Sequence, residues 1–133
     1  MGKGVLLRKV IIRGMGYFYL IAGINHFLTP EFYHPLIPPY FSNPELINYL
    51  AGISEVLLGL GILNYPLRSK AAWGVVLMLV AFIPAHWYFI QMRSCIGDQL
   101  CVDEWLGWIR LILIQPILIG WAIWVALNPK IYG

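Results

Sequence analysis

Four long hydrophobic stretches limit what this chain can fold into, and they cover residues 10–28, 46–65, 72–91 and 106–127. A helix of about 20 residues is long enough to cross the hydrocarbon core of a membrane. The chain has 133 residues, of which 60% are hydrophobic and only 11% are charged. In soluble domains about a quarter of the residues are charged. This composition excludes a soluble globule and a disordered tail. We predict one all-α domain over residues 1–133, an integral membrane four-helix antiparallel bundle.

Basic residues gather at one side of the predicted spans. The seven on that side are Lys3, Arg8, Lys9, Arg13, Arg68, Lys70 and Lys130. The loop of residues 29–45 has no Lys or Arg, and the loop of residues 92–105 has Arg93 against three acidic residues. The positive-inside rule then places both termini in the cytoplasm, and we expect a multi-pass protein of the bacterial inner (plasma) membrane. Because the basic residues mark helix ends, the net charge of +3 does not indicate a nucleic-acid partner.

Glu55 lies near the middle of the second predicted span, where an acidic side chain is costly unless it is neutral, paired or wet. At helical spacing Asn48, Gly52, Glu55 and Gly59 form one stripe. The glycines would let the backbone of a neighbouring helix come close to Glu55. The alternative is a glutamate that only holds helices together through hydrogen bonds.

The other spans also carry polar side chains, at a depth that overlaps that of Glu55. Together with the two polar residues of the second span, they form a set of seven: Tyr19, His26, Asn48, Glu55, His86, Arg110 and Gln115. We predict a polar pocket in the outer half of the bundle, in which Arg110 or a histidine is the partner of Glu55. Each histidine could instead bond a backbone carbonyl, and Arg110 could extend to the membrane surface.

Arg110 and Gln115 are five residues apart, which is about 140° around an α-helix. The two side chains can therefore face one point only if the helix is distorted. Pro116 would allow this distortion, because a proline leaves the carbonyl four residues earlier without its helical donor.

The first outer loop, residues 29–45, holds five of the nine prolines and several aromatic residues. This composition favours a stiff cap on the mouth of the bundle rather than a mobile linker. The cap is either a lid over a pocket or a connector that shields helix ends.

Cys95 and Cys101 are separated by five residues that include Gly97. They lie on the predicted outer side, which is oxidising in a bacterium, and we expect a disulfide between them. The bond is either a structural staple or an active redox pair, although the usual Cys-x-x-Cys spacing of redox pairs is absent. We predict no metal site, since two histidines and one glutamate on separate helices lack metal-ligand spacing.

Several short motifs resemble the DoxX-like family of small four-helix membrane proteins. They are His26-Phe27 with Pro30, the pair Pro38-Pro39, Gly52 with Glu55, Arg68, Pro84-Ala85, and Arg110 with Gln115. His86 stands where that family has an asparagine, and the spacing from Arg110 to Gln115 is one residue longer. The resemblance implies relatives with redox roles and a chaperone of membrane receptors, so it leaves open whether the chain is an enzyme.

We interpret the chain as a redox-associated membrane component that binds a quinone or another lipophilic small molecule. Glu55 and His86 would be the catalytic residues that exchange protons with the ligand. The ligand-binding residues would be His26, Tyr19, Asn48, Arg110 and Gln115. Expected partners are membrane lipid, the lipophilic molecule, a membrane or periplasmic protein, and further copies of the chain. The alternative is a non-enzymatic membrane chaperone or assembly factor, while a transporter of only four helices would require an oligomer.

Overall fold

The computed structural model describes residues 2–97 and 100–131, so Asp98, one of the acidic residues counted above, lies outside the described residues. The described chain is mostly helical. Its helices are α1 (Lys3–Leu28), α2 (Pro30–Tyr33), η1 (His34–Leu36), α3 (Pro44–Leu63), η2 (Tyr65–Leu67), α4 (Arg68–Ala81), α5 (Ile83–Gln91), α6 (Glu104–Ile109), η3 (Arg110–Ile114) and α7 (Gln115–Leu127). Two short antiparallel strands, β1 (Cys95–Ile96) and β2 (Leu100–Cys101), form a hairpin between α5 and α6.

Three helical segments of the described chain are long and apolar enough to cross a membrane by length and composition. They are Pro44–Leu63, Tyr65–Gln91 and Glu104–Leu127. The first predicted span, residues 10–28, is not among them, although it lies inside the 26-residue helix α1. Its hydropathy is lowered by Arg13, Asn25 and His26. Three apolar helices support a membrane protein, and a fourth crossing by α1 stays a prediction.

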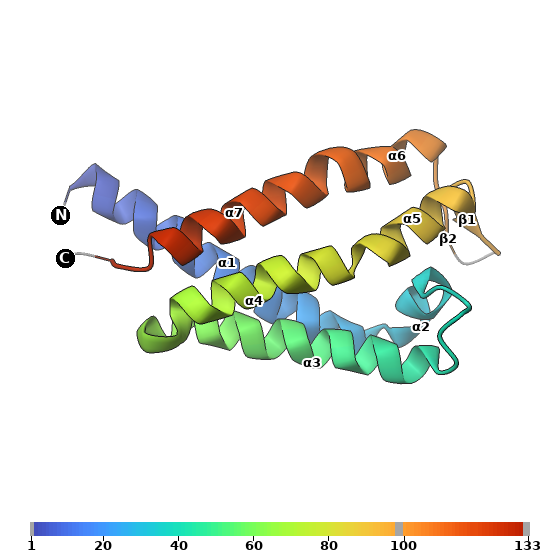
Figure 1. The fold of residues 1–133 in the computed structure, drawn as a ribbon, viewed down its shortest axis with the longest axis horizontal. Helices are drawn as coiled ribbons and strands as arrows, with labels where there is room; N and C mark the ends of the chain where they lie inside the picture. The colour runs from blue at the N-terminus through green and yellow to red at the C-terminus, as the bar shows by residue number, and fades with distance from the viewer. Residues whose placement is uncertain (1, 98–99, 132–133) are drawn as a thin grey trace.

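The long helical segments run side by side, with α1 against α3, α3 against α4, and α4 against α7. Figure 1 shows that α1 begins and α7 ends at the end of the molecule that holds η2. The α2 segment and the β1–β2 hairpin lie at the opposite end (Figure 1). Each loop of the chain is therefore confined to one of two ends.

Prolines end helices in this chain, and side chains from elsewhere replace the helical donors that the prolines lack. Pro30 follows the end of α1 and leaves the carbonyl of His26 without its usual donor, and Asn48 Nδ2 donates to this oxygen at 3.0 Å. Pro66 does the same for Ile62, whose carbonyl accepts from Arg68 Nε at 2.7 Å. The prolines thus create backbone acceptors that polar side chains satisfy across the fold.

Arg68 also bonds the other end of the chain. Its Nη1 donates to the carbonyl of Pro129 at 2.7 Å, and the hydroxyl of Ser69 donates to the carbonyl of Ala126 at 2.8 Å. Arg68 is buried, with 5% of its surface exposed. It therefore joins the ends of α3 and α7 and does not take part in the polar pocket.

The hydrophobic core lies where α1, α3, α4 and α7 meet. Its members are Ile12, Met15, Tyr19, Ile62, Ala71, Ala72, Val75, Met78, Leu79, Ala122, Val125 and Ala126. Many other large apolar side chains are exposed, among them Leu57, Leu77 and Leu127. An outward-facing apolar surface around a small core is what a helix packing in lipid requires.

Glycines bring α1 and α3 into backbone contact. A Cβ on Gly23 would lie 2.7 Å from the carbonyl oxygen of Gly52, and a Cβ on Gly59 would lie 2.7 Å from that of Gly16. No side chain larger than hydrogen fits at these positions without a shift of backbone. The predicted glycine stripe therefore lies at the α1–α3 interface, on the face of α3 that carries Asn48 and Glu55.

Candidate functional site

A cavity of about 880 Å³ lies among α1, the loop that contains η1, α3, α4, α5, η3 and the start of α7. Its wall is mostly apolar. Polar side chains in the wall are Tyr19, His26, Tyr33, Asn48, Ser54, Glu55, His86, Arg110 and Gln115. All seven residues that the sequence analysis proposed for ligand contact or catalysis line this one cavity. Its volume is within the range of small-molecule sites, about 300–1,000 Å³.

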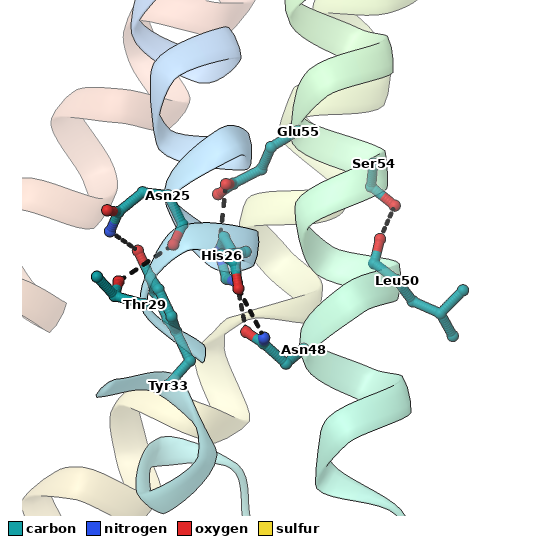
Figure 2. Close-up of polar contacts among 8 residues, drawn as sticks. All are labelled: Asn25, His26, Thr29, Tyr33, Asn48, Leu50, Ser54 and Glu55. Carbon is teal, nitrogen blue, oxygen red and sulfur yellow. Dashed lines mark hydrogen bonds and ion pairs between the residues drawn. The ribbon is translucent and has the colours of Figure 1, made fainter. Parts of the chain in front are cut away.

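His26 joins the two polar residues of α3. Its Nδ1 lies 2.6 Å from Asn48 Oδ1, and its Nε2 lies 3.2 Å from Glu55 Oε2. Figure 2 shows the imidazole between the two side chains, with Asn48 bonded to both the ring and the backbone of His26. The partner of Glu55 is thus a histidine, one of the two candidates predicted, and it comes from α1.

These contacts fix the orientation of the His26 ring. Asn48 Nδ2 donates to the carbonyl of His26, so Asn48 Oδ1 faces the ring and accepts from Nδ1. The other ring nitrogen, Nε2, then faces the Glu55 carboxyl group at 3.2 Å, where a protonated imidazole forms an ion pair. His26 therefore bridges the two polar side chains of α3.

Tyr33 covers the other face of the His26 ring, and sequence reasoning missed it. The two rings stack at a centroid distance of 3.8 Å with an angle of 18° between their planes. Asn25 Nδ2 donates to the Tyr33 hydroxyl at 2.7 Å, which holds α2 against the end of α1 (Figure 2). Nothing in the spacing of the loop marked Tyr33, because its position depends on how α2 folds back.

Two polar atoms at this cavity are buried without a hydrogen-bond partner among the described residues: the Tyr19 hydroxyl and Glu55 Oε2. Tyr19 is 2% exposed and Glu55 is 7% exposed. Oε2 is close to His26, but the contact is an ion pair by distance and lacks the alignment of a hydrogen bond. A buried polar group without a partner costs about 1–3 kcal/mol, so the Tyr19 hydroxyl, which has no ion-pair partner either, favours a ligand that can bond it.

The helix is distorted between Arg110 and Gln115. Residues 110–114 form a π-helical turn, and the Gln115 N–H donates to the carbonyl of Arg110, five residues back. This wider turn brings the two residues to the same side, where both line the cavity. Gln115 Nε2 donates to the carbonyl of Leu79 at 2.6 Å, beside the break between α4 and α5. The distortion that the five-residue spacing required is present, and Pro116 is the second residue of the regular helix α7 that follows it.

Arg110 and His86 are half-buried in the cavity wall. Glu55 pairs with His26, and Glu104 pairs with Arg93. Arg110 therefore has no carboxylate partner within the described residues. The alternative that made Arg110 the partner of Glu55 is not what the structure shows.

The first outer loop folds over the cavity. It contains α2 and η1, and Leu36, Ile37, Pro38 and Phe41 contribute to the cavity wall. Leu36 and Pro38 are buried. The loop therefore covers the cavity as a cap, and its further role as a lid stays a prediction.

The second outer loop contains the β1–β2 hairpin, and a disulfide joins Cys95 to Cys101 across it. The exposed ion pair of Arg93 with Glu104 lies beside it. Neither cysteine lines the cavity. Within residues 2–97 and 100–131, no group of three or more His, Cys, Asp or Glu is placed to hold a metal ion.

A family model described as a domain of unknown function, DUF8561, matches residues 15–126. The chain belongs to this family. The match extends over most of the chain, from α1 to the end of α7, so it contains every residue of the cavity wall. Searches of curated proteins and of solved structures find no match.

The resemblance to the DoxX-like family is wrong, because the matching model is that of DUF8561 and no DoxX family model matches. The motifs behind that resemblance were short pairs of Gly, Pro, Arg and Glu. In this structure Arg68 bonds a freed carbonyl and Gly52 lets two backbones approach, which are general packing roles. Any small membrane bundle needs residues of these kinds for the same reasons, so their combination did not identify a DUF8561 chain.

Proposed function

We propose that this chain is a multi-span membrane protein that binds a lipophilic small molecule with a polar head in the cavity between its helices. The observation that carries the proposal is the buried Tyr19 hydroxyl, which has no partner among the described residues and lies in a largely apolar cavity wall. An apolar body would replace water along the wall, and a polar head would bond this hydroxyl. Nothing in this proposal depends on the DoxX relation.

The proposed setting is a four-span bundle in the inner membrane of a bacterium, with both termini in the cytoplasm. The starts of α1 and α4 and the end of α7 lie at one end of the fold (Figure 1). Six of the seven basic residues counted above belong to these elements, and Lys130 follows α7 directly. This distribution supports the cytoplasmic placement of that end. The cavity, the capping loop and the disulfide would then lie toward the outer side.

The His26–Glu55 pair gives the site a defined chemistry. His26 and Glu55 contact each other in the cavity wall, and either group could exchange a proton with an oxygen of the ligand. His86 and Gln115 offer further polar contacts in the same wall. A quinone, whose oxygens accept hydrogen bonds, is one member of the ligand class. A redox role depends on which member is bound.

The direct test is mass spectrometry of small molecules extracted from the detergent-purified protein, measured per polypeptide. We expect near-stoichiometric amounts of one lipophile in the native protein and at least a fivefold decrease in a Glu55→Gln variant. Glu45→Gln is the matched control, because Glu45 is exposed at the start of α3 and does not line the cavity.

An empty extract from folded native protein would contradict the binding proposal. That result would favour the alternative function, a non-enzymatic assembly factor in which the polar residues serve only helix packing. Equal ligand content in the native protein and in Glu55→Gln would remove Glu55 from the site.

A further inference from the structure

The charge of the cavity wall identifies the class of head group that the site would take. The charged or titratable side chains in the wall are Glu55, Arg110, the histidines His26 and His86, and the tyrosines Tyr19 and Tyr33. Glu55 and His26 compensate each other. Arg110 thus carries a positive charge in the wall, and it has no carboxylate partner within the described chain.

An arginine in this position is expensive without a counter-ion. Arg110 is half-buried, begins the π-helical turn and lies in a mostly apolar wall. Guanidinium is always protonated and presents several N–H donors in one plane, which match a carboxylate or phosphate group. A charge-assisted bond to such a group is roughly twice as strong as a bond between neutral partners.

The cavity is open on the side of α3 and α4. Exposed residues of its wall include Leu77 on α4, at 72% exposure, and Leu57 on α3, at 62%. The two helices touch nearer to η2, where Leu58 packs on Gly74. In Figure 1, α3 and the α4–α5 segment separate from there toward the end that holds α2. An apolar chain could therefore leave the cavity between α3 and α4 and lie against lipid.

From these observations we infer that the ligand is an anionic amphiphile, with a carboxylate or phosphate head paired to Arg110 and an apolar tail that exits between α3 and α4. This inference rests on the proposed binding function and narrows its ligand class. It favours a fatty acid or a lipid phosphate over a neutral ligand such as a quinone. The neutral polar groups nearby, on Tyr19 and Gln115, would complete the hydrogen bonds of the head.

The test compares four radiolabelled probes with the same tail: hexadecanoate, hexadecyl phosphate, neutral hexadecanol and cationic hexadecyltrimethylammonium. Each is titrated against the immobilised full-length protein in neutral detergent. We expect at least one anion to bind about tenfold more tightly than hexadecanol, since one charge-assisted bond is gained. Tighter binding of hexadecanoate would indicate a fatty acid as the ligand, and tighter binding of hexadecyl phosphate would indicate a lipid phosphate.

Variants then assign the preference to one residue. Arg110→Gln should reduce the ratio of anion to alcohol affinity to below about threefold, and Arg110→Lys should restore part of it. Arg93→Gln is the control, because it removes one positive charge from an exposed site outside the cavity. That variant should retain the preference of the native protein.

A second pair of variants tests the opening. Ala81→Trp places a large side chain in the exposed part of the cavity wall and should weaken all probes that bind. Val80→Trp changes the neighbouring exposed residue, which does not line the cavity, and should have no effect.

The outcomes separate this inference from the proposed function. Equal binding of the anions and hexadecanol overturns the anionic head and leaves a lipophile site in place. An anion preference that persists in Arg110→Gln overturns the role of Arg110. If no probe binds while the extracted protein carries a lipophile, the inferred class is wrong; if both experiments are negative, the binding function itself fails.

Discussion

The α1–α3 pair and the α4–α7 side of the molecule differ in the regularity of their helices. In α1 and α3 the helices are continuous, and glycines bring their backbones into contact. On the other side the helices are interrupted, by the break at Phe82 before Pro84 and by the π-helical turn of residues 110–114. Both interruptions lie at the cavity. The regular pair packs closely through its glycines, whereas the interruptions on the other side form part of the cavity wall.

The difference between the two sides bears on how the protein would bind a ligand. Helices in lipid must satisfy every backbone polar group, so a distortion survives only where a side chain, a water or a ligand compensates it. Gln115 compensates one such place by donating to Leu79. The closely packed pair would therefore act as a rigid support, and the distorted side would adapt to the ligand. The following predictions test this division, from the largest expected effect to the smallest.

The strongest test is overpacking of the α1–α3 interface. A methyl group on Gly23 would meet the backbone of Gly52 and Val56 at 2.7 Å, so Gly23→Ala should lower the free energy of unfolding by about 3 kcal/mol. The free energy is measured by titration with a denaturing detergent in mixed micelles. Gly120→Ala is the control, because nothing lies within 4 Å of its added Cβ. Equal stability of the two variants would show that the interface yields easily.

Removal of Asn48 should have the next largest effect. Asn48→Ala leaves two buried groups without partners, the Nδ1–H and the carbonyl of His26. We expect a loss of about 2 kcal/mol, because buried unsatisfied groups are costly but hydrogen bonds between membrane helices are weak on average. The same detergent titration measures it. A loss below that of Gln115→Leu would mean that polar contacts matter more on the distorted side.

Gln115→Leu tests the distorted side itself. It removes one interhelical hydrogen bond, to the carbonyl of Leu79, and should lower stability by only about 1 kcal/mol. The affinity for the anionic hexadecyl probe that binds most tightly should fall by a larger factor than the equilibrium constant of folding, because Gln115 lines the cavity. The probe titration and the unfolding titration on one preparation give both values. A loss of stability without loss of binding would make Gln115 a packing residue.

The smallest effect is expected from shortening the π-helical turn. Deleting Leu113, which is 54% exposed, converts the turn to regular helix and keeps Arg110 and Gln115 on one face, now four residues apart. We expect a folded protein with a change in stability of about 1 kcal/mol or less, since an exposed residue is lost.

The control for that deletion is removal of Ile123 from the regular helix α7. The loss of one residue there turns Val125 and Ala126 by about 100° away from the core, and it should prevent folding. Circular dichroism and size-exclusion chromatography in detergent report both outcomes. If the Leu113 deletion also fails to fold, the turn is a required part of the fold.

Much of the candidate site was predictable from the sequence. The seven proposed residues share one cavity because helical spacing and depth are local properties, readable from residue numbers. A distortion between Arg110 and Gln115 was also predictable, since five residues of regular helix would place the two side chains about 140° apart, but its π-helical form was not predicted. The roles of Tyr33 and Arg68 were not, because their contacts depend on segments that fold back from elsewhere.

The sequence by itself determined which stretches are helical, because hydrophobicity is a property of each segment. The predicted ends were less exact, since α1 begins at Lys3 rather than at residue 10, and the third stretch is divided at Phe82. The fold decided which groups meet across the chain. Asn48 and Glu55 find His26, 22 and 29 residues earlier, only because glycines bring α1 and α3 together. That contact leaves the charge of Arg110 uncompensated in the cavity wall. A neighbour's identity is a property of packing, and no local pattern in the sequence encodes it.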